Sequence, residues 1–209
     1  LGDVYKRQNP IRIGFSRFPV MEGNEGQEQA IRVPSETHAR FDAKGDLDQY
    51  RFEAKGGEPL WIECIASRIR AGSDPVLWID QVTVDAEGIE QFKEIASNDD
   101  SGGNPGGADF PFRNNDCSLL FTPPGDGNYR LRIHDYTGGG GPADLYRLII
   151  QPGAPDYDLV TTSWYAAPAK ATKAISRHSA VIRRGGTTLL RVFAIRRNGF
   201  KDSISLSVK

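Results

Sequence analysis

Apolar and polar side chains alternate in the stretch Asp116–Asp135, which reads DCSLLFTPPGDGNYRLRIHD. The apolar positions on either side of its centre are Cys117, Leu119, Phe121, Tyr129, Leu131 and Ile133. The centre itself holds Pro123, Pro124, Gly125, Asp126 and Gly127, residue types that reverse the direction of a chain. A period of two residues is typical of antiparallel strands with one buried and one exposed face. The stretch therefore predicts a β-hairpin.

The same alternation recurs along the chain at intervals of about eight to twelve residues, with turn residues between the runs. Further strands are predicted at 30–33, 38–41, 49–54, 60–67, 76–84, 91–97 and 145–151, and a second group begins near 156, 179, 187 and 203. No helical periodicity persists for three turns. The 23 glycines and 13 prolines fit many short strands joined by turns. The pattern predicts an all-β protein, and an antiparallel β-sandwich in particular.

Three segments differ in composition. The first eight residues, LGDVYKRQ, share no pattern with the rest of the chain, so we expect residues 1–20 to be an adaptor-like sequence and the tail of an upstream element. Residues 21–152 are expected to form the main β-sandwich. Residues 153–209 are expected to begin a second β-domain, which is truncated inside an alternating run.

The overall charge gives no reason to expect nucleic acid or an anionic membrane as a partner. The net charge is −1, from 26 basic and 27 acidic side chains, which offers no bulk attraction to nucleic acid or to an anionic membrane. No apolar run reaches the length of a membrane span. His38, His134 and His178 are scattered, and the HExxH, zinc-finger and GxSxG patterns are absent. The residues mark no catalytic centre, so we expect a protein that is not an enzyme.

The two cysteines, Cys64 and Cys117, each fall on the inward face of a predicted strand. They are either two buried apolar thiols or a disulfide that links two strands. Spacing along the chain does not decide between these interpretations, because sequence supplies no distance between the two residues.

Several pieces occur in a characteristic order: GDLDQYRFEAKGGEPL (45–60), ASRIRAGSDPVLWI (66–79), IASNDD (95–100), the stretch 116–135 and YRLII (146–150). Together, over about residues 20–152, they resemble the bacterial prepeptidase C-terminal domain of large secreted proteins. The later run RRGGTTLLRVFAIRRNGFKDSISLSV (183–208) is similar to the start of an Ig-like module.

This resemblance implies a jelly-roll-like sandwich that serves as a non-catalytic accessory module of a secreted or cell-surface bacterial protein, in an extracellular, periplasmic or cell-surface location. Such domains are similar to the collagen-binding domains of bacterial collagenases. The expected role is substrate or matrix binding, or the spacing of domains. The expected partners are other domains of the same polypeptide and an extracellular protein or polysaccharide. Two alternatives stay open: a contribution to the active-site region of a peptidase-associated hydrolase, and a calcium-stabilised adhesion module.

The resemblance also implies a candidate calcium site. Some relatives bind Ca²⁺ through an acidic segment at the start of the domain and a later Asp-x-Asp turn, and Ca²⁺ takes six to eight oxygen ligands. The corresponding residues here are Glu22, Asn24, Glu25, Asp46 and Asp48. The first segment departs from the family pattern, because Val20 and Gly23 replace a Glu and a Pro. A second cluster of candidate oxygen ligands is Asn98, Asp99, Asp100 and Asp116. Of these, Asp99 and Asp100 are expected instead to hold a loop together.

Exposed aromatic rings offer a second kind of site. Trp61, Trp78 and Tyr136 are candidate ligand platforms, since aromatic faces stack on sugars and on peptide rings. The alternative is that these rings cover a sheet or an interdomain contact. The neighbouring Arg130 and Arg132 fall on an outward face and are expected to stay in water.

Overall fold

A computed structural model describes residues 15–24, 26–100, 114–164, 182 and 184–207. The strands are β1 (Val20–Glu22), β2 (Gln29–Ala30), β3 (Ser35–Arg40), β4 (Leu47–Ala54), β5 (Leu60–Ile65), β6 (Pro75–Val84), β7 (Glu90–Asn98), β8 (Cys117–Phe121), β9 (Gly127–Asp135), β10 (Leu145–Pro152), β11 (Asp156–Trp164) and β12 (Leu189–Arg197). A short 3₁₀ turn, η1, spans Ser67–Ile69. The described part of the chain has no α-helix, and within it no helix could span a membrane. The all-β prediction is confirmed.

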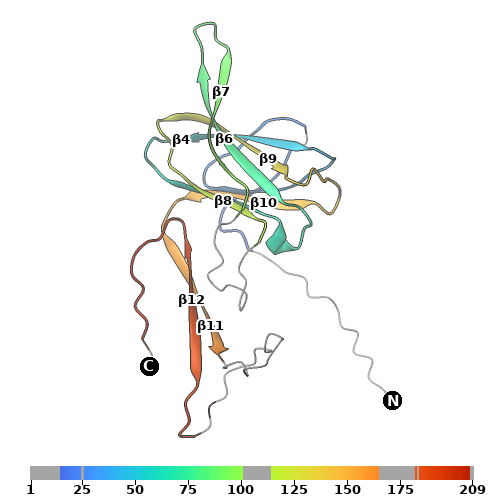
Figure 1. The fold of residues 1–209 in the computed structure, drawn as a ribbon. Coiled ribbons are helices and arrows are strands. Elements are labelled where there is room, and N and C mark those ends of the chain that lie inside the picture. The colour runs from blue at the N-terminus through green and yellow to red at the C-terminus, as the bar shows by residue number, and fades with distance from the viewer. Residues whose placement is uncertain (1–14, 25, 101–113, 165–181, 183, 208–209) are drawn as a thin grey trace, which may run out of the picture.

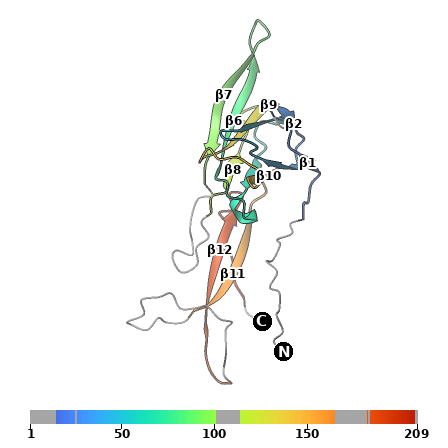
Figure 2. The same ribbon diagram turned by 90° about the vertical axis from the view of Figure 1, so that its right-hand side faces the viewer.

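Two five-stranded sheets pack face to face (Figure 1). Sheet A has the order β1-β3-β10-β5-β8, and sheet B has the order β2-β4-β9-β6-β7. Most neighbouring strands are antiparallel, but the short edge strands β1 and β2 pair in parallel with β3 and β4. The β6–β7 hairpin projects from one end of the sandwich, and a separate β11–β12 hairpin extends from the other (Figures 1 and 2). The expected β-sandwich is confirmed.

The core lies between the two sheets and follows the alternation read from the sequence. Its largest fully buried side chains are Tyr50, Tyr129, Tyr146, Phe41, Phe52, Ile62, Leu77, Ile79, Leu131, Ile133, Leu148 and Ile150. Both faces of this interior contribute aromatic rings. Phe121 of sheet A meets Tyr129 of sheet B edge to face, with ring centroids 5.3 Å apart. Such a pair favours a fixed spacing of the sheets.

The predicted hairpin at 116–135 is wrong in its pairing. Both strands form, but β8 pairs with β5 in sheet A, whereas β9 lies between β4 and β6 in sheet B. The turn between them therefore connects two sheets. Two strands that face each other across a core bury the same alternate positions as two strands side by side, so periodicity alone does not distinguish these arrangements.

Two other strand predictions change. The strand expected at 30–33 is reduced to Gln29–Ala30, because the chain leaves sheet B after Ile31 and crosses to β3 in sheet A. The strand expected near 203 is wrong, since residues 201–207 form no strand. Alternation makes a strand only where a neighbour supplies hydrogen bonds. The strand expected near 179 lies outside the described residues.

Candidate functional site

The candidate calcium residues divide between the first strand and the β3–β4 loop. Glu22 ends β1, where it lies opposite His38 of β3. The Asn24 backbone N–H donates to Gln29 Oε1 at 2.9 Å, which closes the following turn. Glu25 lies outside the described residues. In the β3–β4 loop, Asp46 Oδ2 accepts a hydrogen bond from the Asp42 backbone N–H at 2.7 Å.

Asp48 differs from these residues because it points into the core and is only 5% exposed. The Tyr146 hydroxyl donates to Asp48 Oδ2 at 2.6 Å, and the Tyr50 hydroxyl lies 2.6 Å from the Tyr146 hydroxyl. Burial raises the pKa of Asp48 to about 6, the negative charges of Asp46 and Asp42 add to this, and the Tyr146 hydrogen bond opposes it. A buried carboxylate with a raised pKa is common at functional sites.

The segment after β1 comes close to this buried group. A Cβ atom placed on Gly23 would lie 3.2 Å from the Tyr50 hydroxyl. Gly23, between Glu22 and Asn24, therefore approaches the pair of tyrosine hydroxyls that contacts Asp48. Within the described residues, however, no three His, Cys, Asp or Glu side chains are grouped so that they could hold a metal ion. Calcium binding stays a prediction.

The three candidate aromatic residues do not form one platform. Trp61 lies in β5 of sheet A, whereas Trp78 lies in β6 of sheet B. Tyr136 follows β9 directly and is 69% exposed, and its backbone N–H donates to the Asp74 carbonyl at 2.7 Å. The outer faces of the two sheets therefore offer separate surfaces.

Charged and aromatic side chains cross-link the outer face of sheet B. Asp80 is only 2% exposed and accepts hydrogen bonds from Arg130 Nε at 2.9 Å and from Arg132 Nε at 2.8 Å. The expectation that these arginines stay in water is wrong, because strands β6 and β9 place them directly over the buried carboxylate. The arginine side chains on this face are therefore already paired within the chain.

Trp78 belongs to the same network. Its ring stacks on His134 with centroids 4.8 Å apart, and the Arg132 guanidinium lies 5.4 Å from the ring centroid. Phe92 is covered by Arg130, whose guanidinium is 3.5 Å from the ring centroid. Because side chains of the same chain already occupy these ring faces, Trp78 is a weaker ligand platform than the sequence indicates.

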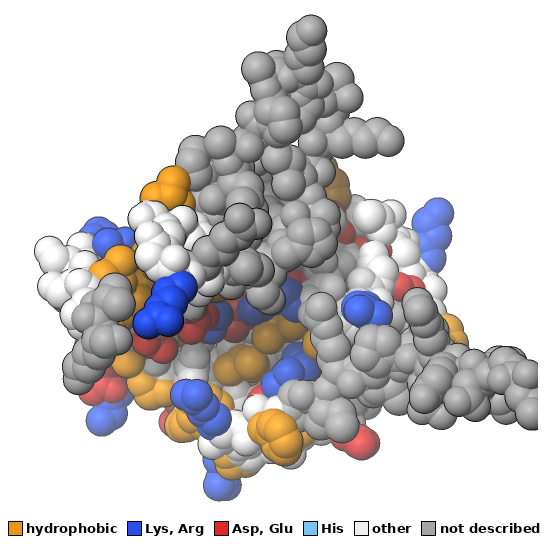
Figure 3. All heavy atoms as spheres, turned by 90° about the horizontal axis from the view of Figure 1, so that it is seen from below, with side chains coloured by type: hydrophobic (Ala, Val, Ile, Leu, Met, Phe, Trp, Pro, Cys, Tyr) orange, Lys and Arg blue, Asp and Glu red, His pale blue; other side chains and the backbone are white. Residues whose placement is uncertain are grey.

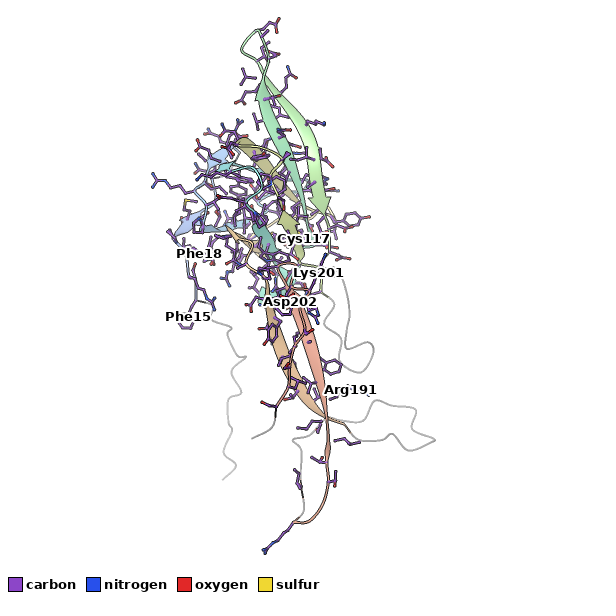
Figure 4. All side chains as sticks on the ribbon, turned by 90° about the vertical axis from the view of Figure 1, so that its left-hand side faces the viewer. Phe15, Phe18, Cys117, Arg191, Lys201 and Asp202 are labelled. Atoms are coloured by element: carbon purple, nitrogen blue, oxygen red, sulfur yellow. The ribbon has the colours of Figure 1, made fainter. Side chains whose placement is uncertain are left out.

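Trp61 lines a hollow of about 260 Å³ on the outer side of sheet A. The lining comes from the segment before β1 (Phe15, Arg17, Phe18), from sheet A (Glu36, Trp61, Glu63, Arg147, Ile149, Gln151) and from the β11–β12 region (Asp156, Asp158, Arg197, Asn198). Seen from this side, the molecule is hollowed, with hydrophobic side chains at the bottom and charged ones around them (Figure 3). Figure 4 shows Phe15 and Phe18 on the side of the sandwich toward which the β11–β12 hairpin extends.

The hollow contains a buried carboxylate. Glu36 is 2% exposed, and its Oε1 accepts from Arg147 Nε at 2.7 Å and lies 2.6 Å from His38 Nε2. Burial by itself raises the pKa of Glu36, but hydrogen bonds with Ser16, His38 and Arg147 outweigh burial and hold the pKa below its ordinary value. Glu36 therefore presents a fixed negative charge, paired with Arg147, in the hollow that Trp61 also lines.

Sequence reasoning missed Glu36 and Arg147. Strand β3 departs from simple alternation, since Ser35, Glu36 and Thr37 are all buried. The only available signal was the position of Arg147 between Tyr146 and Leu148, which places its side chain on the outward face of β10. The pairing of β10 with β3, which joins the two residues, is not visible in the sequence.

The fold and these surfaces define an all-β sandwich module. No protein-family profile matches the chain, and no curated protein sequence matches it. Among solved structures, the chain is similar to the pre-peptidase C-terminal domain of collagenase from Bacillus anthracis, with 15% identity and a TM-score of 0.42 over 61% of this chain and 96% of that one. The resemblance read from the sequence thus has a counterpart among solved structures.

Two further solved structures are similar. CorA, a surface-associated copper-binding protein of Methylomicrobium album BG8, shares 12% identity at a TM-score of 0.38, over 62% of this chain and 98% of that one. PliG, a periplasmic inhibitor of g-type lysozyme from Aeromonas hydrophila, shares 11% identity at a TM-score of 0.37, over 62% of this chain and 97% of that one.

Proposed function

We propose that the chain is a non-catalytic accessory module of a larger secreted or cell-surface protein, and that it binds an extracellular protein or polysaccharide through the Trp61 hollow. The observation that carries this proposal is the combination of aromatic rings, Trp61 among them, with the buried, paired Glu36 carboxylate in a hollow of about 260 Å³. An aromatic face supplies stacking, and fixed polar groups supply orientation, which is the usual composition of a ligand site.

The arrangement of polar groups around Glu36 supports binding over catalysis. His38 Nε2 lies 2.6 Å from Glu36 Oε1, and the Ser16 hydroxyl donates to the Phe18 carbonyl at 2.8 Å. In a serine hydrolase the histidine contacts the serine and removes its proton, and the acid lies behind the histidine. Here the His38 Nε2 atom contacts Glu36 and the Ser16 hydroxyl donates to a backbone carbonyl, so this pair is not arranged as a nucleophile and its base.

The experiment is a pull-down of the chain on cellulose, chitin, xylan and collagen fibrils, with Trp61→Ala compared with Trp78→Ala. The two substitutions remove the same ring from opposite faces of the sandwich. We expect Trp61→Ala to lower the retained fraction about tenfold on the material that the wild type binds, which is the effect of losing one stacking contact of about 1.4 kcal/mol. Trp78→Ala should bind normally where it stays folded.

If Trp61→Ala binds as much as the wild type and Trp78→Ala loses binding, the hollow is not the binding site. The site would then lie on the outer face of sheet B. A chain that binds none of the four materials supports domain spacing as the role of the module. A chain that hydrolyses peptide or glycoside substrates would contradict the proposal, and the hydrolase alternative would then replace it.

The β11–β12 hairpin supports a role between domains. It forms a two-stranded sheet of its own, and Tyr157, Leu159, Leu190 and Val192 on one of its faces are each at least 38% exposed. A two-stranded hairpin is marginally stable alone. We propose that residues 153–209 are part of a second, Ig-like domain whose other strands cover this face. Limited proteolysis should cleave near residue 153 before it cleaves within the sandwich.

A calcium-stabilised form is the second candidate function. The observation that favours it is the approach of Gly23, between Glu22 and Asn24, to the Tyr50 hydroxyl, which contacts the Tyr146 hydroxyl that donates to Asp48. A ligand bound only by the folded state raises stability. Melting should therefore shift upward when Ca²⁺ replaces a chelator. The shift should vanish in Asp46→Asn and persist in Glu87→Gln, an exposed acid at the far hairpin. Equal midpoints in Ca²⁺ and in chelator would reject the site.

A further inference from the structure

The two cysteines of the chain are direct partners across two strands. Cys64 in β5 pairs with Cys117, the first residue of β8. Both side chains are completely buried, and both are free thiols in this structure. Figure 4 shows Cys117 within the body of the sandwich. Because the chain has only these 2 cysteines, no other disulfide can form within it.

The strand geometry suits a covalent link. Directly opposed residues in antiparallel strands have Cα atoms about 4.5 to 5.5 Å apart, and this range falls inside the span of about 4.4 to 6.8 Å that a disulfide bridges. The neighbouring pairs Glu63↔Ser118 and Ile62↔Leu119 keep the same register. A bond between the two sulfur atoms therefore requires no movement of the backbone along the strands.

Asp116, the residue before Cys117, ties the start of β8 to the residues that follow Cys64. This buried carboxylate accepts hydrogen bonds from the backbone N–H groups of Ala66 at 2.8 Å and Ser67 at 2.6 Å, and it pairs with Arg68. The residues just beyond Cys64 are thereby tied to the residue just before Cys117. Such an anchor favours the return of the two thiols to opposed positions after the strand end has opened.

Strand β8 controls access to the thiols. It is the last strand of sheet A, so its only hydrogen-bonded neighbour in the described sheet is β5. Burial raises the pKa of the Cys64 thiol well above its usual value, and the adjacent Cys117 thiol adds to the shift. The thiols are thus unreactive while β8 is in place. A short edge strand of 5 residues opens locally more readily than a central strand, and opening exposes both sulfur atoms.

We propose that Cys64 and Cys117 form a reversible disulfide that locks edge strand β8 onto β5, by exchange with a low-molecular-weight disulfide. When β8 opens, one cysteine thiolate attacks the external disulfide, which forms a mixed disulfide and releases one small thiol. The second thiolate then attacks the protein sulfur of the mixed disulfide and expels the second small thiol. Two protein thiols and one external disulfide become one protein disulfide and two small thiols, so atoms and electrons balance.

The bond changes what the sandwich can do. In the reduced state β8 is held to β5 by backbone hydrogen bonds and by the Asp116 contacts, none of them covalent, and it can open locally. In the oxidised state the strand end is tied to β5, and a loop that runs from residue 64 to residue 117 is closed in the unfolded chain as well. Closing a loop of this length lowers the entropy of the unfolded state and stabilises the fold. The disulfide is inferred from the register of β5 and β8, so it is independent of whether the Trp61 hollow binds a ligand.

The test uses the full chain, incubated with oxidised glutathione or with dithiothreitol. Intact mass after alkylation in denaturant counts the free thiols, and peptide mapping without reductant locates the bond. We expect the oxidised wild type to take up no alkylating group, to remain monomeric on a non-reducing gel, and to melt about 5 °C or more above the reduced form. The Cys64→Ala and Cys117→Ala variants each keep one thiol and should show no such shift.

Three results would overturn the proposal. Two alkylatable thiols after prolonged incubation with oxidised glutathione would show that the pair does not exchange. A disulfide between two chains would show that the opposed thiols do not meet. A bond within the chain that lowers the melting temperature would show that β8 must distort to form it. Because wild type and variants are each compared with themselves across redox states, a loss of baseline stability in a variant does not affect the comparison.

Discussion

The buried carboxylate of Asp48 should make the sandwich more stable at mildly acidic pH than at neutral pH. Burial raises its pKa from 3.8 to about 6 in the folded state. The folded state therefore holds a proton that the unfolded state has released. Because the folded pKa is the higher one, the stabilisation from this proton is complete below about pH 3.8 and is lost as the pH rises through about 6. The sign is opposite to that of a carboxylate in a salt bridge.

The size of the effect is set by the shift in the Asp48 pKa. The difference of about 2.2 between a pKa of about 6 and the ordinary 3.8 corresponds to about 3 kcal/mol of unfolding free energy. Asp48→Asn removes the charge and keeps the oxygen that accepts from Tyr146. One amide hydrogen left without a partner costs about 1 kcal/mol. The variant should therefore be about 2 kcal/mol more stable than the wild type near neutral pH, and about 1 kcal/mol less stable near pH 3.

The assay is urea unfolding followed by tryptophan fluorescence, over a pH series in chelator. The difference in unfolding free energy between wild type and Asp48→Asn is taken at each pH, because this difference cancels the groups that titrate equally in both proteins. In Asp46→Asn the midpoint of the dependence should move to lower pH, since the Asp46 charge raises the pKa of Asp48. A difference that stays constant between about pH 3 and pH 7 would refute the reasoning.

Two further substitutions probe other parts of the fold. Replacing both Arg130 and Arg132 by Met leaves Asp80 buried without its ionic partners, so the free energy of unfolding in urea should fall by about 3 to 5 kcal/mol, and Asp80→Asn in the same background should restore part of it. A Cβ atom on Gly140 would collide with the Ala43 carbonyl, so Gly140→Ala should lower the melting temperature, whereas Gly57→Ala, which meets no atom, should lower it only through its positive φ. A Gly140→Ala variant that melts with the wild type would contradict the close approach of these loops.

Much of the fold could be read from the alternation of side chains. The positions of β4, β5, β6, β9 and β10 follow the predicted runs closely, and burial alternates along β4, β9 and β10. Strand β6 departs from alternation at a bulge between Ile79 and Asp80. The alternation also predicted that Cys64 and Cys117 point inward, and the structure confirms this. The alternation carries a further signal: Asp48 falls on the same face of its strand as the buried Tyr50 and Phe52, which indicates that the carboxylate points inward.

The candidate sites were less predictable, because they depend on which strands become neighbours. Trp61, Trp78 and Tyr136 looked equivalent in the sequence, but Trp61 lies over a hollow on sheet A, whereas the ring of Trp78 is covered by His134 on sheet B. Glu36 meets Arg147 only because β3 and β10 pair. No local pattern encodes a contact between residues so far apart along the chain.

The sequence by itself determined the fold class and the inward face of most strands, because side chains in a strand alternate whatever its partner is. Only the tertiary structure decided that β8 and β9 lie in opposite sheets, that Cys64 faces Cys117, and that Asp80 is enclosed by two arginines. Alternation reports which side of a strand is apolar. Pairing and register are set by the whole chain, through the one arrangement that buries all apolar faces together and satisfies the backbone between them.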